Sequence, residues 1–252
     1  MASRFVEHGL PPLHYLGRTS GPPPVWLEIR APLEQARLRR HPVFAGEDQP
    51  RGDGRAVLVV PGFAGGDGGM AVLRDWLERL GYRAAASGLA FNIRYSEAVL
   101  AMLTARLMEL YAEEGRRVAI VGHSRGGLLA KVLAHRYQAL VEQVAGMGSP
   151  FAEPFDLHPV TMAGVRAAQL VNLVRFGRSG RIERGFLADL AEPARVPLTS
   201  IYSRSDGIVH WEACLRPDAT CVEVRSSHVG LAFSWAAYSL LAGLLAGRLP
   251  GA

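Results

Sequence analysis

The stretch Gly122-His-Ser-Arg-Gly126 places a lone serine, Ser124, between two glycines, with an apolar run before it and another after it. Glycine inside a strand or helix costs roughly 0.5–1 kcal/mol relative to alanine, so a sharp bend is expected here. The pattern is G-x-S-x-G, which exposes a serine hydroxyl on a strained turn when a strand precedes it and a helix follows. The spacing therefore predicts that Ser124 is a nucleophile.

A serine hydroxyl is a weak nucleophile unless a base takes its proton and an acid orients that base. With a G-x-S-x-G turn, the acid and then the histidine follow the serine along the chain, each after a strand. Asp206 follows the expected strand 198–203, and His228 follows the expected strand 221–225. We therefore expect Asp206 to be the acid and His228 the general base. Asp206 before Gly207 is also ordinary turn chemistry, which leaves Glu212 and Asp218 as alternative acids.

The other seven histidines have less suitable positions for a base. His123 directly precedes Ser124 and is expected to pack beneath the turn, and His210 beside Asp206 is the second choice as base. The remaining five lie in the N-terminal segment, in the helix expected after Ser124 or in the expected cap: His8, His14, His41, His135 and His158.

Short apolar runs alternate with helical apolar faces along the chain. This alternation favours βαβ crossovers, and so a mostly parallel sheet with helices on both faces. Functional side chains in such sheets lie beyond the carboxyl ends of the strands, where Ser124, Asp206 and His228 all fall. The expected strands are 56–60, 82–87, 117–121, 144–148, 198–203 and 221–225, and the expected helices include 70–80, 99–110 and 128–133.

Three further segments complete the expected organisation. Residues 1–54, rich in proline and polar groups, are expected to form an arm across the domain, with a helix near 31–39. Residues 229–247 carry no charge and are expected to form a buried C-terminal helix in preference to a membrane anchor. Residues from about 151 to 195 are expected to form a helical cap, or alternatively surface helices. Their apolar face would comprise Val160, Met162, Val165, Leu170, Val171, Leu173 and Val174.

Composition narrows the classes of function. The 252 residues carry 28 basic and 23 acidic side chains, a formal net charge of +5. The arginines are scattered, so no nucleic-acid partner is expected. The first residues contain no apolar core of signal-peptide length, so we expect a cytoplasmic protein, or a secreted or periplasmic one if a signal peptide has been removed. No metal or nucleotide motif is found, and the oligomeric state stays open.

Five pieces occur in order from Val57 onward: VLVVPGFAGG, VGHSRGGLLA, GMGSPF, IYSRSDGIV and SSHVGL. Together they resemble the α/β-hydrolase superfamily, specifically its bacterial lipases and esterases. The resemblance implies one α/β-hydrolase domain over residues 1–252. It would have a mostly parallel central sheet with helices on both faces. A small helical cap would follow the family's sixth-strand region, which corresponds in this chain to the strand expected at 144–148.

The resemblance also implies roles for individual residues. Ser124 would be the nucleophile, His228 the base and Asp206 its partner, and the backbone N–H groups of Phe63 and Arg125 would form an oxyanion hole. Because many relatives carry His-Gly where this chain has Pro61-Gly62, Ala64 is an alternative donor. The Arg125 side chain is expected to be structural.

The expected activity is hydrolysis of a small-molecule or lipid ester through an acyl-enzyme, by a carboxylesterase or lipase that needs no cofactor. A thioesterase, an acyltransferase or a polyester depolymerase would use the same residues. A rival of another class is a non-catalytic binding protein on this scaffold. Cys214 and Cys221 are seven residues apart, and the sequence leaves open whether they form a disulfide or stay free thiols.

Overall fold

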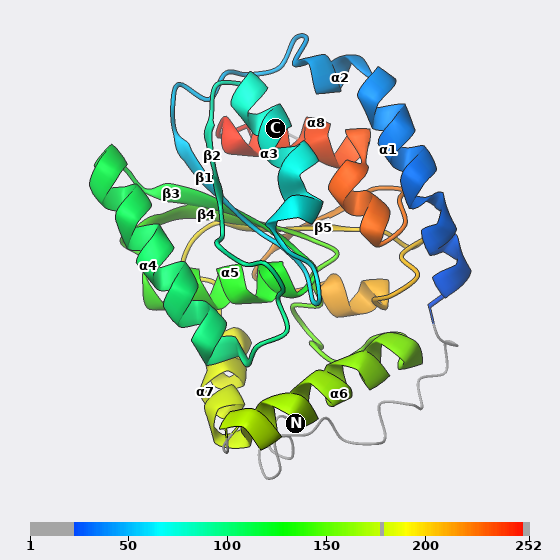
Figure 1. The fold of residues 1–252 in the computed structure, drawn as a ribbon. Helices are drawn as coiled ribbons and strands as arrows, with labels where there is room; N and C mark the ends of the chain where they lie inside the picture. The colour runs from blue at the N-terminus through cyan, green and yellow to red at the C-terminus, as the bar shows by residue number, and fades with distance from the viewer. Residues whose placement is uncertain (1–22, 177–178, 249–252) are drawn as a thin grey trace.

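A six-stranded, all-parallel sheet lies at the centre of the molecule (Figure 1). The computed structural model describes residues 23–176 and 179–248. The strand order is β2-β1-β3-β4-β5-β6. All six expected strands form, with bounds shifted by a few residues: β1 Ala56–Val60, β2 Arg83–Ala86, β3 Val118–His123, β4 Val141–Met147, β5 Leu198–Tyr202 and β6 Thr220–Glu223. The predicted fold class is confirmed.

Alternate residues of the central strands enter two separate apolar cores, one on each face of the sheet. On one face, Val57 and Val59 of β1 pack with helices α3 (Ala71–Arg79) and α8 (Trp235–Leu245). On the other, Leu58 and Val60 pack with α4 (Ser96–Glu114), α5 (Arg125–Arg136) and α7 (Ser179–Ala191). Because β1 and residues 118–121 of β3 are buried on both faces, these segments are continuously apolar, as is typical of central parallel strands.

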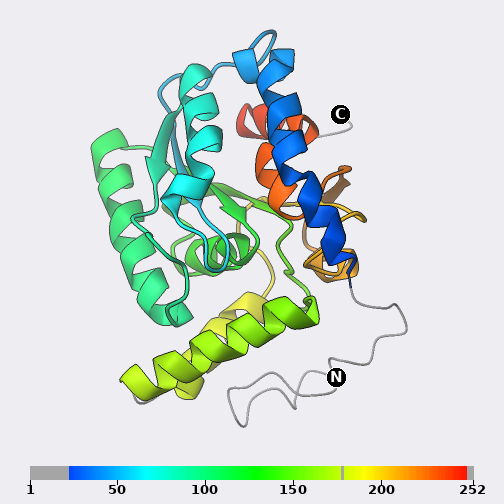
Figure 2. The same ribbon diagram turned by 45° about the vertical axis from the view of Figure 1, so that its right-hand side comes forward.

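The described part of the N-terminal segment packs on the α3–α8 face. It contains the 3-10 helix η2 (Val25–Arg30), α1 (Ala31–Arg40) and the short α2 (Pro42–Ala45). Leu38 and Val43 are buried in the core of that face, and the Trp76 indole N–H donates to the Val43 carbonyl oxygen at 2.7 Å. Figure 2 shows α1 running along the same side of the molecule as α8. We call residues 23–54 the arm.

Two helices, α6 (Pro159–Phe176) and α7, fill the chain between β4 and β5. Met162 is buried and Val165 faces inward, but most of the expected apolar face of α6 points to solvent. The apolar residues of α6 therefore lie on more than one side of the helix, and only some of them contact the rest of the domain. The exposed ones are Val160, Leu170, Val171, Leu173 and Val174.

The uncharged C-terminal stretch is two helices where the sequence predicted one. A 3-10 helix, η5 (Val229–Phe233), ends at Ser234, whose hydroxyl oxygen accepts the Ala237 N–H at 3.4 Å and begins α8. Six residues of α8 are buried against the sheet. No helix among the described residues combines the length and apolar character needed to cross a membrane.

Candidate active site

Ser124 lies on the turn between the end of β3 and the start of α5. Its backbone has φ 52° and ψ −124°, a conformation that costs a non-glycine residue about 1–3 kcal/mol. The Ser124 N–H donates to the Met147 carbonyl oxygen of β4 at 2.8 Å, and its carbonyl oxygen accepts the Gly127 N–H at 3.0 Å. These contacts hold the strained turn and leave the side chain at the rim of a pocket.

The two glycines of the motif are required by close backbone contacts. A Cβ at Gly122 would lie 2.4 Å from the Gly126 carbonyl carbon and the Gly127 nitrogen, and a Cβ at Gly126 would overlap the Val60 carbonyl oxygen of β1. Any larger side chain would push α5 away from the strands. The glycines therefore let the helix start directly beneath the serine.

Asp206 and His228 are brought together beyond the ends of β5 and β6. The His228 Nδ1–H donates to Asp206 Oδ2 at 2.6 Å, and both side chains are almost fully buried. The other Asp206 oxygen, Oδ1, accepts the N–H groups of Ile208 and Val209 at 2.8 and 2.7 Å. The carboxylate is thus fixed by its own turn and orients the imidazole with its second oxygen.

Charges around His228 favour its protonated form. Burial is the largest single influence and opposes protonation, but the charge and hydrogen bond of Asp206, with the charge of Glu28, together raise the pKa of His228 above its ordinary value. The imidazolium that forms when His228 accepts a proton is therefore stabilised in place.

His123 contacts the same histidine from the other side. Its Nε2–H donates to the backbone carbonyl oxygen of His228 at 2.9 Å, and the two ring centroids are 4.9 Å apart. Burial, with a smaller effect from His228, lowers the pKa of His123 to about 4, so this imidazole is neutral at neutral pH. His123 therefore connects the turn that carries Ser124 to the His228 loop.

Of the alternative acids and base, Asp218 and His210 have other partners. Asp218 pairs with the Arg216 guanidinium at 2.7 Å and accepts the Ala194 N–H. Glu212 lies in the short helix η4 (Trp211–Cys214), and His210 lies 3.7 Å from Asp156. None of them takes part in the Asp206–His228 pair. His8 and His14 lie outside the described residues.

The loop after β1 lies opposite the start of α5. The Ala64 N–H donates to the Asn92 carbonyl oxygen at 3.2 Å, whereas the Phe63 N–H has no protein acceptor within the described chain. The Arg125 N–H begins α5, where backbone donors lack intrahelical partners. Of the two expected loop donors, the geometry thus favours Phe63 over Ala64.

The Arg125 side chain makes structural contacts. Its guanidinium donates to the Asn92 carbonyl and side-chain oxygens, both at 2.9 Å, and to the Arg94 carbonyl oxygen at 2.6 Å. Asn92, fully buried, donates its side-chain N–H to the Pro61 carbonyl oxygen at 2.8 Å. Asn92 therefore ties the loop after β1 to the helix that follows Ser124, a role that its position in an irregular stretch did not reveal.

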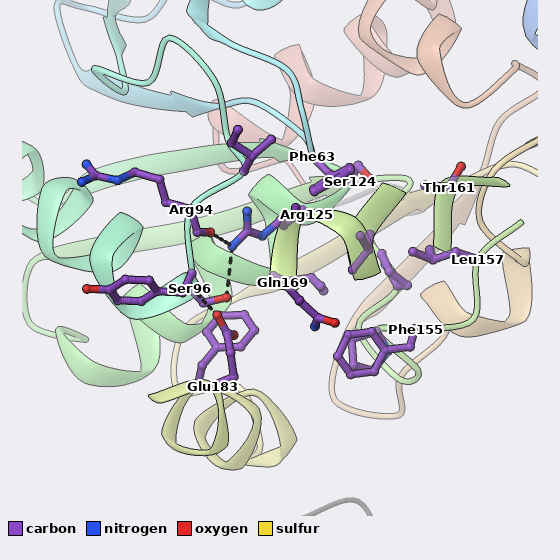
Figure 3. A pocket seen from close by; sticks show the side chains of 18 of the residues that line it. Phe63, Arg94, Ser96, Ser124, Arg125, Phe155, Leu157, Thr161, Gln169 and Glu183 are labelled. Carbon is purple, nitrogen blue, oxygen red and sulfur yellow. Dashed lines mark hydrogen bonds between the residues drawn. The ribbon is translucent and has the colours of Figure 1, made fainter. Parts of the chain in front are cut away.

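A pocket opens beside Ser124, between the start of α5 and helices α6 and α7 (Figure 3). Apolar side chains dominate its wall, and Gln169 and Glu183 add polar groups. Its volume is about 100 Å³. The apolar lining includes Phe63, Leu128, Phe155, Leu157, Val165 and Phe186.

Two glutamates of the arm also reach the His228 loop. Glu28 accepts the His228 N–H at 2.8 Å, and Glu34 accepts the Ser227 N–H at 3.0 Å. No sequence motif marks either residue.

Cys214 and Cys221 are free thiols in the structure. Cys214 is buried, and burial, with the nearby charge of Asp206, raises the pKa of its thiol well above the ordinary value. The described residues contain no cluster of three or more His, Cys, Asp or Glu side chains placed to bind a metal ion.

Solved structures with a similar fold are lipases and esterases. A mature lipase from Bacillus licheniformis is 18% identical with a TM-score of 0.58, and the match covers 79% of this chain and 94% of the lipase. A Paleococcus ferrophilus monoacylglycerol lipase is 16% identical with a TM-score of 0.55, covering 79% and 96%. Est1E from Butyrivibrio proteoclasticus is 14% identical with a TM-score of 0.55, covering 80% and 93%.

The sequence matches no protein-family model and no curated relative. The sheet order, the flanking helices and these structural neighbours define the class: the chain has the fold of the α/β-hydrolase superfamily.

Proposed function

We propose that this protein is a serine hydrolase of carboxylic esters, with Ser124, His228 and Asp206 as its catalytic residues. One observation carries the proposal. Ser124 is held in a strained backbone conformation at the rim of an apolar pocket, and His123 beside it is bonded to the loop that bears the buried Asp206–His228 pair. A binding protein would have no need of this arrangement.

In the proposed reaction, Ser124 Oγ attacks the ester carbonyl carbon while His228 Nε2 takes the hydroxyl proton. The oxyanion accepts hydrogen bonds from the N–H groups of Phe63 and Arg125, each worth about 2.7–4 kcal/mol of barrier lowering in enzymes of this kind. His228 then gives its proton to the leaving alkoxide, and the acyl group stays on Ser124. Water, deprotonated by His228, attacks the acyl-enzyme and releases the acid.

The pocket suggests which part of the ester it holds. Its apolar wall between the start of α5 and the α6–α7 segment suits an acyl chain. The α6–α7 segment would then act as the cap expected from the sequence, with the inward side of α6 contacting the acyl chain. Phe63 lines the same pocket, so the proposed oxyanion donor and the acyl site are adjacent.

Replacing the nucleophile tests the proposal. Ser124→Ala should reduce p-nitrophenyl butyrate hydrolysis to background, a loss on the order of a millionfold in enzymes that use this mechanism. A fluorophosphonate should label the wild type at Ser124, as located by peptide mass spectrometry. Ser239→Ala, which changes an exposed serine on α8, should keep wild-type activity. Full activity in the Ser124 variant, or labelling at another residue, would overturn the assignment.

A further inference from the structure

Glu28 of the arm joins the two loops that carry Asp206 and His228. Its Oε1 accepts the N–H groups of Gly207 at 2.9 Å and of His228 at 2.8 Å. Its Oε2 accepts the Val229 N–H at 2.8 Å. One carboxylate therefore holds the residue after the aspartate, the histidine and the residue after the histidine. Hydrogen bonds to a charged acceptor are roughly twice as strong as neutral ones.

Glu34, on the next helix of the arm, binds the residue before the histidine. Its Oε1 accepts the Ser227 N–H at 3.0 Å, and its Oε2 accepts the Ser227 hydroxyl at 2.6 Å. The Ser227 hydroxyl oxygen in turn accepts the Gly230 N–H at 3.1 Å. The two glutamates thus bind successive backbone groups of a single turn around His228.

The loops are shaped to receive these carboxylates. A Cβ added at Gly207 would lie 2.8 Å from both Glu28 Oε1 and the Pro24 carbonyl oxygen, and one added at Gly230 would overlap the Glu34 carboxylate. Both glycines therefore allow the arm to approach the loops more closely than a side chain would permit. The contact is close-packed and specific.

Four titratable side chains surround His228 from different elements. Asp206 faces it from the loop after β5, His123 from the end of β3, Glu28 from η2 and Glu34, through Ser227, from α1. Glu28 is one of the charges that raise the pKa of His228, and Glu34 is not among them. The two glutamates therefore differ in electrostatic effect, although both hold the same turn.

We propose that Glu28 and Glu34 are positioning residues of the active site, through which the arm sets the place of His228 relative to Asp206 and Ser124. The inference rests on the proposed function. The His228 backbone is then held from two directions, at its N–H by Glu28 and at its carbonyl oxygen by His123, while Asp206 orients the ring. Neither glutamate contacts the reacting atoms.

Four variants test the two contacts and separate the effect of the Glu28 charge from that of its side-chain length. Glu28→Gln keeps the length of the side chain but removes the charge and places an N–H₂ group against N–H donors. Glu28→Asp keeps the charge and shortens the reach. Glu34→Ala removes the second contact and leaves Glu28 in place. Glu47→Gln changes an exposed glutamate of the same arm and serves as the control. The measurements are kcat/KM for p-nitrophenyl butyrate against pH, and the melting temperature.

We expect Glu28→Gln to lower kcat/KM by roughly 10- to 100-fold, as misplacement of a catalytic group by up to about 1 Å does. Its acid limb should move to lower pH, because loss of the Glu28 charge lowers the pKa of His228. Glu28→Asp and Glu34→Ala should lower kcat/KM and keep the wild-type midpoint. Glu47→Gln should match the wild type in kcat/KM and in the midpoint of the acid limb. A loss of activity caused only by instability would not move the midpoint.

Wild-type kcat/KM together with a wild-type acid limb in Glu28→Gln would overturn the inference. If Glu28→Gln does not fold, the Glu28→Asp variant provides the test. Full activity of Glu28→Asp would then overturn the inference. NMR titration of the His228 imidazole in Ser124→Ala, with and without Glu28→Gln, gives a readout that needs no turnover. A wild type that neither hydrolyses esters nor reacts with fluorophosphonate would refute the proposed function, and the titration would still test the contact.

Discussion

At the scale of single residues, His123 couples the stability of the fold to pH. The unfolded imidazole binds a proton below about pH 6.5, whereas the folded one does so only below about 4. Unfolding therefore takes up a proton between these values, and stability falls as pH drops through this window, by about 3 kcal/mol in total. The contribution of His228 to the pH dependence of stability has the opposite sign. Its raised pKa contributes stability that is complete below pH 6.5 and is lost as pH rises through the folded value.

Replacing His123 by glutamine should remove the part of the stability that is lost as the pH falls. Glutamine can keep an N–H donor toward the His228 carbonyl oxygen but cannot be protonated. We therefore expect the free energy of unfolding, measured by urea denaturation, to fall less steeply between pH 6.5 and 4 in His123→Gln than in the wild type. An identical slope in the two proteins would show that His123 is protonated in the folded state as readily as in the unfolded one.

Residues with local sequence signals could be predicted, and residues placed by distant contacts could not. Ser124 has glycines on both sides, and Asp206 and His228 follow strands. Each signal lies within a few residues of the side chain concerned. Glu28 and Glu34 bind loops that are 179 to 201 residues away in the chain. Only the packing of α1 and η2 against η5 brings them there, so no local pattern marks them.

At the scale of elements, the turn between β3 and α5 depends on the contact of Gly126 with β1. Gly126→Ala must move either the helix or the strand, because the Cβ would meet the backbone oxygens of Val60 and Pro61. We expect a loss of about 1–3 kcal/mol in the free energy of unfolding, as for overpacking in a core, with a loss of esterase activity. Gly69→Ala is the matched control, since a Cβ there meets nothing within 4 Å.

Those two variants are compared by urea denaturation and by hydrolysis of p-nitrophenyl butyrate. Equal stability and activity in both would mean that the turn tolerates a side chain at position 126.

Periodicity identified the helices around this turn well, because they bury a broad apolar face. It left the orientation of α6 open, because the apolar residues of that helix lie on more than one side. It missed the break at Ser234, where a serine before a helix is a capping signal.

At the scale of the whole molecule, the arm belongs to the hydrophobic core. Leu38 of α1 is fully buried with residues of α3 and α8, whereas Leu33 on the same helix is 52% exposed. Leu38→Ala should therefore lower the free energy of unfolding by about 2–5 kcal/mol, and Leu33→Ala should change it by about 0.5 kcal/mol or less. Urea denaturation of both variants checks this. Equal effects would mean that the arm does not unfold cooperatively with the rest of the domain.

The hydrogen bond from the His228 N–H to Glu28 connects residues 200 positions apart. A ribosome adds about 5–20 residues per second, so roughly 10–40 s separate the synthesis of the two partners. Throughout that interval the carboxylates of the nascent arm have no loop to bind, and Ser124 emerges long before its proposed base. The proposed esterase is thus inactive during translation. It gains activity only when nearly the whole sheet has left the exit tunnel and the last strand has joined it.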